Sequence, residues 1–156
     1  MKSIELLGKG EEMHGRSYIK IDASELEEAI KKLKENGFNH FVMLSCIDWI
    51  EKNEFELVYH MWSYEHREHV MLSIRIPRDK AEMNSMSHLF PQIETYEREI
   101  HEMYGIKFIG NTRLTPFLLE GWRHMPPMRK DFDSVKFAKR LYEGIPFIEE
   151  EENEGV

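Results

Sequence analysis

Two histidines in one short polar turn are the first residues whose types and spacing could do chemistry. His66 and His69 stand three positions apart, with Glu65 and Glu68 beside them. Zinc accepts such ligands, but a catalytic zinc needs three protein ligands and a structural zinc needs four. The turn supplies two histidines, so we interpret them as surface residues. A small metal-dependent enzyme that uses His66 and His69 with a nearby carboxylate is the remote alternative.

Two further groups lie on a predicted apolar strand at residues 41–49. Cys46 is the single cysteine, which excludes an internal disulfide and a cysteine-only metal cluster. Burial in an apolar strand would leave its thiol inert. Asp48 falls near the end of the strand beside Trp49. We expect this carboxylate to accept hydrogen bonds and brace the fold, not to catalyse a reaction.

The most informative stretch is a charged helix predicted at residues 92–104. Its apolar residues share one face, and on the other side Glu94 and Glu102 each stand four residues from Arg98, at the spacing of helical ion pairs. Gly105 ends the helix. Such a surface is typical of contact with another protein and offers no substrate site. The residues expected at this partner interface are Glu97, Arg98, Glu99, Tyr104 and Gly105.

A second expected contact lies in the segment that follows. Residues 110–148 contain four of the six prolines and many apolar side chains. They are too apolar for a free linker and too irregular to fold alone, so we expect them to wrap over their own sheet or over a neighbour. A basic pair could bind phosphate, but the acid and the aromatic ring after it favour a docking segment. The residues expected to anchor it are Arg129, Lys130, Asp131 and Phe132.

The elements that must position these groups predict an α+β fold in a single domain. Apolar residues alternate or run continuously at 41–49, 55–62 and 70–76, and short polar links separate these strands, so we expect an antiparallel meander. A short strand is expected at 18–21. Residues 1–15 show no clear pattern.

Helices are expected to pack on this sheet. The clearest spans residues 22–36, where Ser24 and Glu27 have the spacing of a capping box and Gly37 provides a stop. Residues 80–89 have a shorter, helix-like pattern. The predicted domain covers residues 1–133, and an extended C-terminal tail with an acidic end covers 134–156.

Composition narrows the function classes. The net charge of −8 argues against a nucleic-acid partner, because such proteins carry a basic footprint. No apolar run approaches the roughly 20 residues that span a bilayer, and the N-terminus lacks the apolar core of a secretory signal. We therefore expect no direct membrane insertion and a cytoplasmic location. Abundant lysine and glutamate with a single glutamine are typical of thermophile proteins.

The charged helix and the tail together resemble one protein family. Glu-Arg-Glu at 97–99 and Gly-Ile-Lys-Phe at 105–108 closely resemble the signature of the 30-kilodalton subunit family of respiratory complex I, the C subunit of NADH:quinone oxidoreductase. Pro-Met-Arg-Lys-Asp-Phe at 127–132 is similar to that family's tail, and Asp48 matches its strand-end aspartate. The resemblance covers residues 22–133.

One departure refines this resemblance. Complex I members usually continue with His-Pro-Asp-Leu-Arg-Arg, whereas this chain has Asn-Thr-Arg-Leu-Thr-Pro at 111–116. That segment is more similar to the version in energy-converting membrane-bound nickel–iron hydrogenases and related archaeal sulfur-reducing complexes. The lysine- and glutamate-rich composition is compatible with such a source.

The resemblance implies a non-catalytic structural subunit in the peripheral cytoplasmic arm of a complex-I-related membrane complex, which couples electron transport to ion translocation. It implies no catalytic, cofactor-binding or metal-binding residue in this chain. The implied partners are a hydrogenase-large-subunit-like protein and a small iron–sulfur protein. They would hold the Fe–S clusters and, in a hydrogenase, the NiFe site. The alternative within the family is the C subunit of a quinone-reducing complex I.

Overall fold

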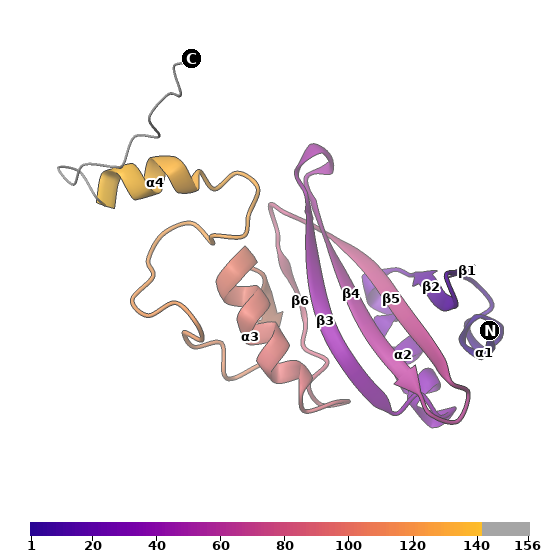
Figure 1. The fold of residues 1–156 in the computed structure, drawn as a ribbon. Coiled ribbons are helices and arrows are strands. Elements are labelled where there is room, and N and C mark those ends of the chain that lie inside the picture. Colours follow the sequence, from indigo (N-terminus) through magenta and orange to yellow (C-terminus); the bar gives the residue numbers. More distant parts are fainter. Residues whose placement is uncertain (142–156) are drawn as a thin grey trace, which may run out of the picture.

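A five-stranded twisted sheet carries the fold (Figure 1). The computed structural model describes residues 1–141, so the acidic end lies outside the described residues. The strands run in the order β1-β2-β5-β4-β3. Their bounds are β1 Glu11–Met13, β2 Arg16–Lys20, β3 His40–Trp49, β4 Glu54–Ser63 and β5 Glu68–Pro77.

The predicted meander is confirmed, because β3, β4 and β5 pair as consecutive antiparallel strands. Leu44 lies opposite Tyr59, and Tyr59 lies opposite Leu72. Strand β2 pairs with β5 in parallel, a pairing that the local pattern did not predict. It requires a crossover, and the helix α2, Leu26–Glu35, lies in the connection between β2 and β3.

The first helices differ in detail from the expectation. Helix α2 follows a 3-10 turn at Ala23–Glu25, and the cap lies two residues before the predicted one: the Asp22 N–H donates to Glu25 Oε2 at 3.1 Å. Residues 1–15, which showed no pattern, form the helix α1, Lys2–Leu7, and strand β1. Glu68 fixes this N-terminal part, since its carboxylate accepts hydrogen bonds from Ser3 and Ser17.

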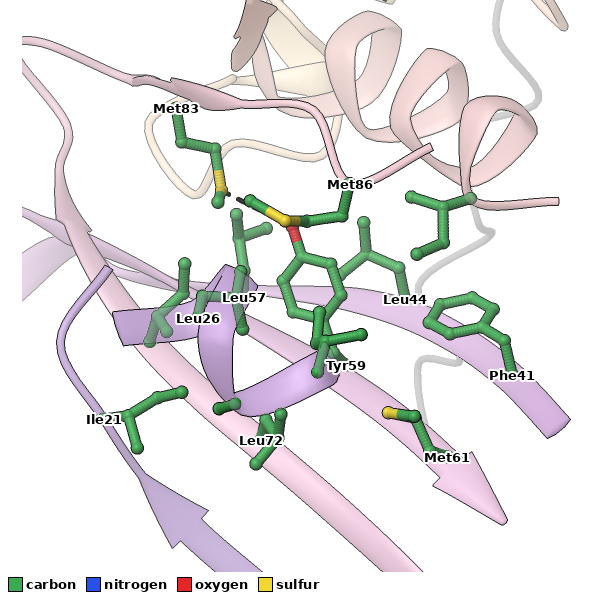
Figure 2. Close-up of a cluster of buried hydrophobic side chains, with 14 of the residues drawn as sticks. Ile21, Leu26, Phe41, Leu44, Leu57, Tyr59, Met61, Leu72, Met83 and Met86 are labelled. Atoms are coloured by element: carbon green, nitrogen blue, oxygen red, sulfur yellow. Dashed lines mark hydrogen bonds between the residues drawn. The ribbon is translucent and has the colours of Figure 1, made fainter. Parts of the chain in front are cut away.

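The apolar core lies between the sheet and helix α2. Alternate residues of β4 point into it, as predicted: Phe55, Leu57, Tyr59 and Met61 are fully buried. In Figure 2 the Tyr59 ring stands between the sheet and two methionines, and its hydroxyl donates to Met83 Sδ at 3.5 Å. Burial of one face of each strand explains why period-two alternation located them correctly.

A smaller layer continues the chain. The short strands β6 Glu82–Asn84 and β7 Lys107–Ile109 pair in parallel and flank the helix α3, Ile93–Tyr104, in sequence. The helix expected at 80–89 is therefore wrong, because pairing with a strand some 25 positions later outweighs the local pattern. Residues Ser134–Leu141 form the helix α4 instead of extended chain. Among the described residues, no helix is long and apolar enough to cross a membrane.

Candidate partner interface around helix α3

Helix α3 forms as the sequence predicted and lies beside strand β3 (Figure 1). Ile93 and Ile100 are buried, and the Tyr96 hydroxyl donates to the carbonyl of Val42 at 3.1 Å. Gly105 ends the helix with φ 79°, a left-handed conformation that glycine adopts without strain. These contacts fix which face of the helix packs on the sheet.

Glu97 does not present a polar face to solvent, so that part of the prediction is wrong. Its side chain is 0% exposed and accepts hydrogen bonds from Ser85 Oγ at 2.7 Å, the Met86 N–H at 2.9 Å and Asn111 Nδ2 at 2.9 Å. Burial raises the pKa of the Glu97 carboxyl, although these donors act in the opposite direction. Glu97 therefore joins the chain before α3 to the chain after it.

Glu102 holds the following loop through backbone groups. Its carboxylate accepts the N–H groups of Phe117 at 2.9 Å, Leu118 at 2.7 Å and Leu119 at 3.2 Å. Burial alone would raise the pKa of Glu102, but the three N–H donors outweigh it and the pKa is lowered. A charged carboxylate in this position fixes the loop against the helix.

Arg98 contacts the same loop from the neighbouring turn. Its Nη2 donates to the carbonyl of Pro116 at 2.9 Å, and its guanidinium lies 5.0 Å from the ring centre of Phe117. The ion pairs expected between Arg98 and the helical residues Glu94 and Glu102 are absent from residues 1–141. The loop offers several polar partners at once, and these displace exposed pairs worth about 0.3 kcal/mol each.

Residues 110–141, called the tail from here on, are anchored on the sheet by a partly buried charge cluster. Arg78 pairs with Asp48, Nε to Oδ1 at 2.8 Å, and with Asp131, Nη2 to Oδ1 at 2.8 Å. The Lys130 N–H donates to Asp48 Oδ2 at 2.9 Å, and Arg129 pairs with Asp131 at 3.3 Å. The bracing role expected of Asp48 is confirmed. Through these contacts the segment wraps over its own domain, which was one of the two outcomes expected from the sequence.

Phe132 packs within the tail itself. Its ring centre lies 5.7 Å from that of Trp122 and 5.5 Å from that of Phe137, on helix α4. The Trp122 and Phe137 rings are 4.9 Å apart. These three rings form a small aromatic cluster that joins α4 to the preceding loop.

A groove of about 350 Å³ remains open between β3 and α3. Met43 and Cys46 line it from the strand, Met103 and Tyr104 from the helix, and Met128 from the tail. Burial, with a smaller contribution from the nearby Asp48 charge, raises the pKa of the Cys46 thiol far above its usual range. The raised pKa agrees with the inert thiol expected from the sequence.

The two histidines considered for metal binding are not brought together on a common ligand site. His66 Nε2 lies 3.0 Å from the carbonyl oxygen of Asn36, whereas His69 Nδ1 lies 2.8 Å from His60 Nε2. Within residues 1–141, no group of three or more histidine, cysteine, aspartate or glutamate side chains is placed to hold a metal ion.

The predicted interface residues thus fall into two groups. Glu97, Arg98 and Asp131 bind their own chain, while Glu99 is exposed and Tyr104 lines the groove. Sequence reasoning missed the partners of the buried acids, which are Ser85, Asn111 and Arg78. A signal existed for Arg78: it directly follows the proline that ends β5.

The family can be decided from this chain as a whole. Residues 19–138 match the family model of the respiratory-chain NADH dehydrogenase 30 Kd subunit. The chain belongs to this family. The match includes the meander, helix α3 and the anchored tail, so the resemblance recognised in the sequence is confirmed.

Named relatives share this region. The C subunit of the F(420)H(2) dehydrogenase of Methanosarcina mazei is 35% identical over 76% of this chain and 75% of its own length. The C subunit of the NADH-quinone oxidoreductase of Phenylobacterium zucineum is 28% identical over 78% of this chain. The chain spans 58% of that relative and 22% of the fused C/D subunit of Phocaeicola vulgatus, which is 36% identical.

Solved structures agree on the fold. A chain of the membrane-bound sulfane sulfur reductase, an archaeal respiratory membrane complex, superposes with a TM-score of 0.85 at 30% identity. The match covers 99% of this chain and 95% of that one. The trypsin-resistant fragment of Nqo5 has the same fold, with a TM-score of 0.61 at 19% identity over 75% of this chain.

Proposed function

We propose that this protein is a non-catalytic structural subunit in the peripheral arm of a complex-I-related membrane complex, of the ferredoxin-linked hydrogenase or sulfur-reducing type. The observation that carries the proposal is the likeness to a chain of the sulfane sulfur reductase over 99% of this chain, at 30% identity. A likeness of that extent includes the tail as well as the sheet. The arm would lie on the cytoplasmic side of the membrane.

In this proposal the chain supplies shape and contact surface. Its tail is fixed to the sheet by Arg78 and to α3 by Glu102, so both would present a preformed surface to a neighbour. A hydrogenase-large-subunit-like protein and a small iron–sulfur protein would dock there. Those partners would hold the Fe–S clusters and any NiFe site, and electron transfer through them would be coupled to ion translocation.

A second candidate function keeps the chain in the same family but makes quinone the electron acceptor of the complex. The name of one relative, the C subunit of an NADH-quinone oxidoreductase, favours the C subunit of a quinone-reducing complex I. Elemental analysis of the purified assembly identifies the hydrogenase type, and a quinone-binding assay on the same assembly separates the sulfur-reducing type from the quinone-reducing type. Stoichiometric nickel supports the hydrogenase type, whereas iron without nickel is compatible with the sulfur-reducing and quinone-reducing types.

Purification of the assembly tests the proposal directly. The full chain would carry an affinity tag and be recovered from gently solubilised membranes of the cells that produce it. We expect a fixed stoichiometry with iron–sulfur proteins, with iron in the recovered assembly. Recovery of the chain alone from the soluble fraction, or turnover of a small molecule by the isolated chain, would overturn the proposal.

A further inference from the structure

The two edges of the sheet are built differently. The edge at β1 is three residues long, and Glu11 and Glu12 on it are exposed. Short, charged edges resist pairing with other chains. The opposite edge, β3, is ten residues long, and the stretch 41–47 carries no charged side chain. A long apolar edge of this kind accepts further strands unless something covers it.

Hydrogen bonds from outside the sheet reach only the ends of that edge within residues 1–141. The Tyr96 hydroxyl donates to the carbonyl of Val42 at one end, and the Lys130 N–H reaches the side chain of Asp48 at the other. Between them, no backbone bond from outside the sheet reaches residues 43–47 within the described part of the chain. Because pairing alternates along an antiparallel strand, half of these backbone groups point away from β4.

The groove beside this edge supplies side-chain contacts. Four consecutive strand residues, 43–46, line it, and Met103 and Met128 complete its apolar wall. Methionine-rich walls adapt to varied apolar partners. Glu99, also in the lining, is exposed and has no ion-pair partner among residues 1–141. The groove therefore combines apolar contact with an unpaired negative charge.

We propose that β3 accepts an extended apolar segment of a neighbouring subunit as a sixth strand, with a lysine or arginine of that segment placed against Glu99. Such strand addition takes affinity from main-chain hydrogen bonds and specificity from alternate side-chain pockets. A second copy of this chain fits less well, because residues 40–49 contain no lysine or arginine and would leave both copies of Glu99 unpaired. The inference rests on the proposed function, since it needs a partner protein.

Hydrogen exchange with mass spectrometry tests it on the purified assembly and on the isolated full chain. We expect the outward-facing amides of residues 43–47 to exchange at least about tenfold more slowly in the assembly. Peptides from β1 serve as the internal control and should keep their rate. If the assembly is recovered and residues 43–47 exchange as in the isolated chain, the sixth strand is wrong while the proposed function stands.

Two other occupants have distinct outcomes. Protection already present in the isolated chain, and lost in a chain that ends at residue 141, would assign the edge to this protein's own C-terminal residues. Protection that rises with concentration together with a doubled mass would assign it to a second copy. Either result overturns the proposal.

Two single charge-reversal variants, one at Glu99 and one at a control site, test the role of Glu99. Glu99→Arg should speed exchange of residues 43–47 in the assembly severalfold or reduce the amount recovered. Glu35→Arg, an exposed site at the end of α2, is the matched control and should change neither. Equal behaviour of the two variants would remove the proposed cation from the partner segment.

Discussion

Strands β4 and β5 bury apolar side chains against helix α2, whereas residues 111–131 lie over helix α3 and the end of the sheet, where charged groups hold them. Leu57 and Leu72, in the first region, are 0% exposed. In the second, Glu102 holds three backbone N–H groups and Arg78 joins two aspartates. Apolar burial is non-directional and stabilises the whole domain, while a carboxylate that fixes a loop stabilises mainly that loop.

The largest expected effect comes from the first region. Leu57→Ala removes a fully buried side chain from a central strand and should lower the free energy of unfolding by about 3 kcal/mol. Val58→Ala, at the next position on the half-exposed outer face, should cost about 1 kcal/mol. Urea denaturation followed by circular dichroism measures both. Equal losses would show that the two faces of the sheet are equally covered.

Glu97 lies in the second region but is as buried as the core. Glu97→Ala leaves the Met86 N–H and the Asn111 amide without their acceptor, so we expect a loss of about 2 kcal/mol. Glu99→Ala, two positions along the same helix, removes an exposed carboxylate and should change stability by less than about 0.5 kcal/mol. The same denaturation experiment compares them. An unchanged free energy of unfolding in Glu97→Ala would contradict the proposal that Glu97 holds the segments before and after α3 together.

The same contrast explains what the sequence could and could not predict. The strands of the first region were located because burial on one face leaves a period of two along the chain, as at residues 55–61. Helix α3 and its end at Gly105 were located by an apolar face and a stop. These signals are local, so a single chain displays them.

The contacts of the charged residues are not local. Glu97 and Glu99 look alike in the sequence, yet one is buried and the other exposed, because the partners of Glu97 lie 11 to 14 positions away. The spacing rule for helical ion pairs considers the helix alone and misses the loop that competes for Arg98. The parallel pairings of β2 with β5 and of β6 with β7 were missed for the same reason, because each joins residues that lie far apart in the sequence.

A smaller, local effect is expected at Glu102. Glu102→Gln keeps one acceptor oxygen and loses the charge that draws three N–H groups. We expect a local loss of about 1 kcal/mol, which makes amide exchange at residues 117–119 about fivefold faster. The midpoint of global unfolding should stay nearly unchanged, and Glu99→Gln should leave both quantities as they are. A large global loss would mean that the loop and the sheet unfold as one unit.

Acid should separate the two regions by the pH at which each weakens. Burial, and then the nearby His69 and Arg16 charges, lowers the pKa of His60 on β4 from 6.5 to about 4. The unfolded chain then binds a proton that the folded chain does not, so this contribution to stability is complete above pH 6.5 and is lost as the pH falls towards about 4. The pKa of Glu102 is lowered from 4.5, so its contribution is lost only below that value.

The measurement is a difference between wild type and variant, which cancels the other titrating groups. The stability difference between wild type and His60→Gln should change between pH 6.5 and about 4 and be flat above pH 6.5. The difference in exchange at residues 117–119 between wild type and Glu102→Gln should stay constant over that upper range and shrink only below pH 4.5. If both differences changed over the same pH range, the two regions would unfold as a single cooperative unit. The loop would then not be a docking surface that is held independently of the sheet.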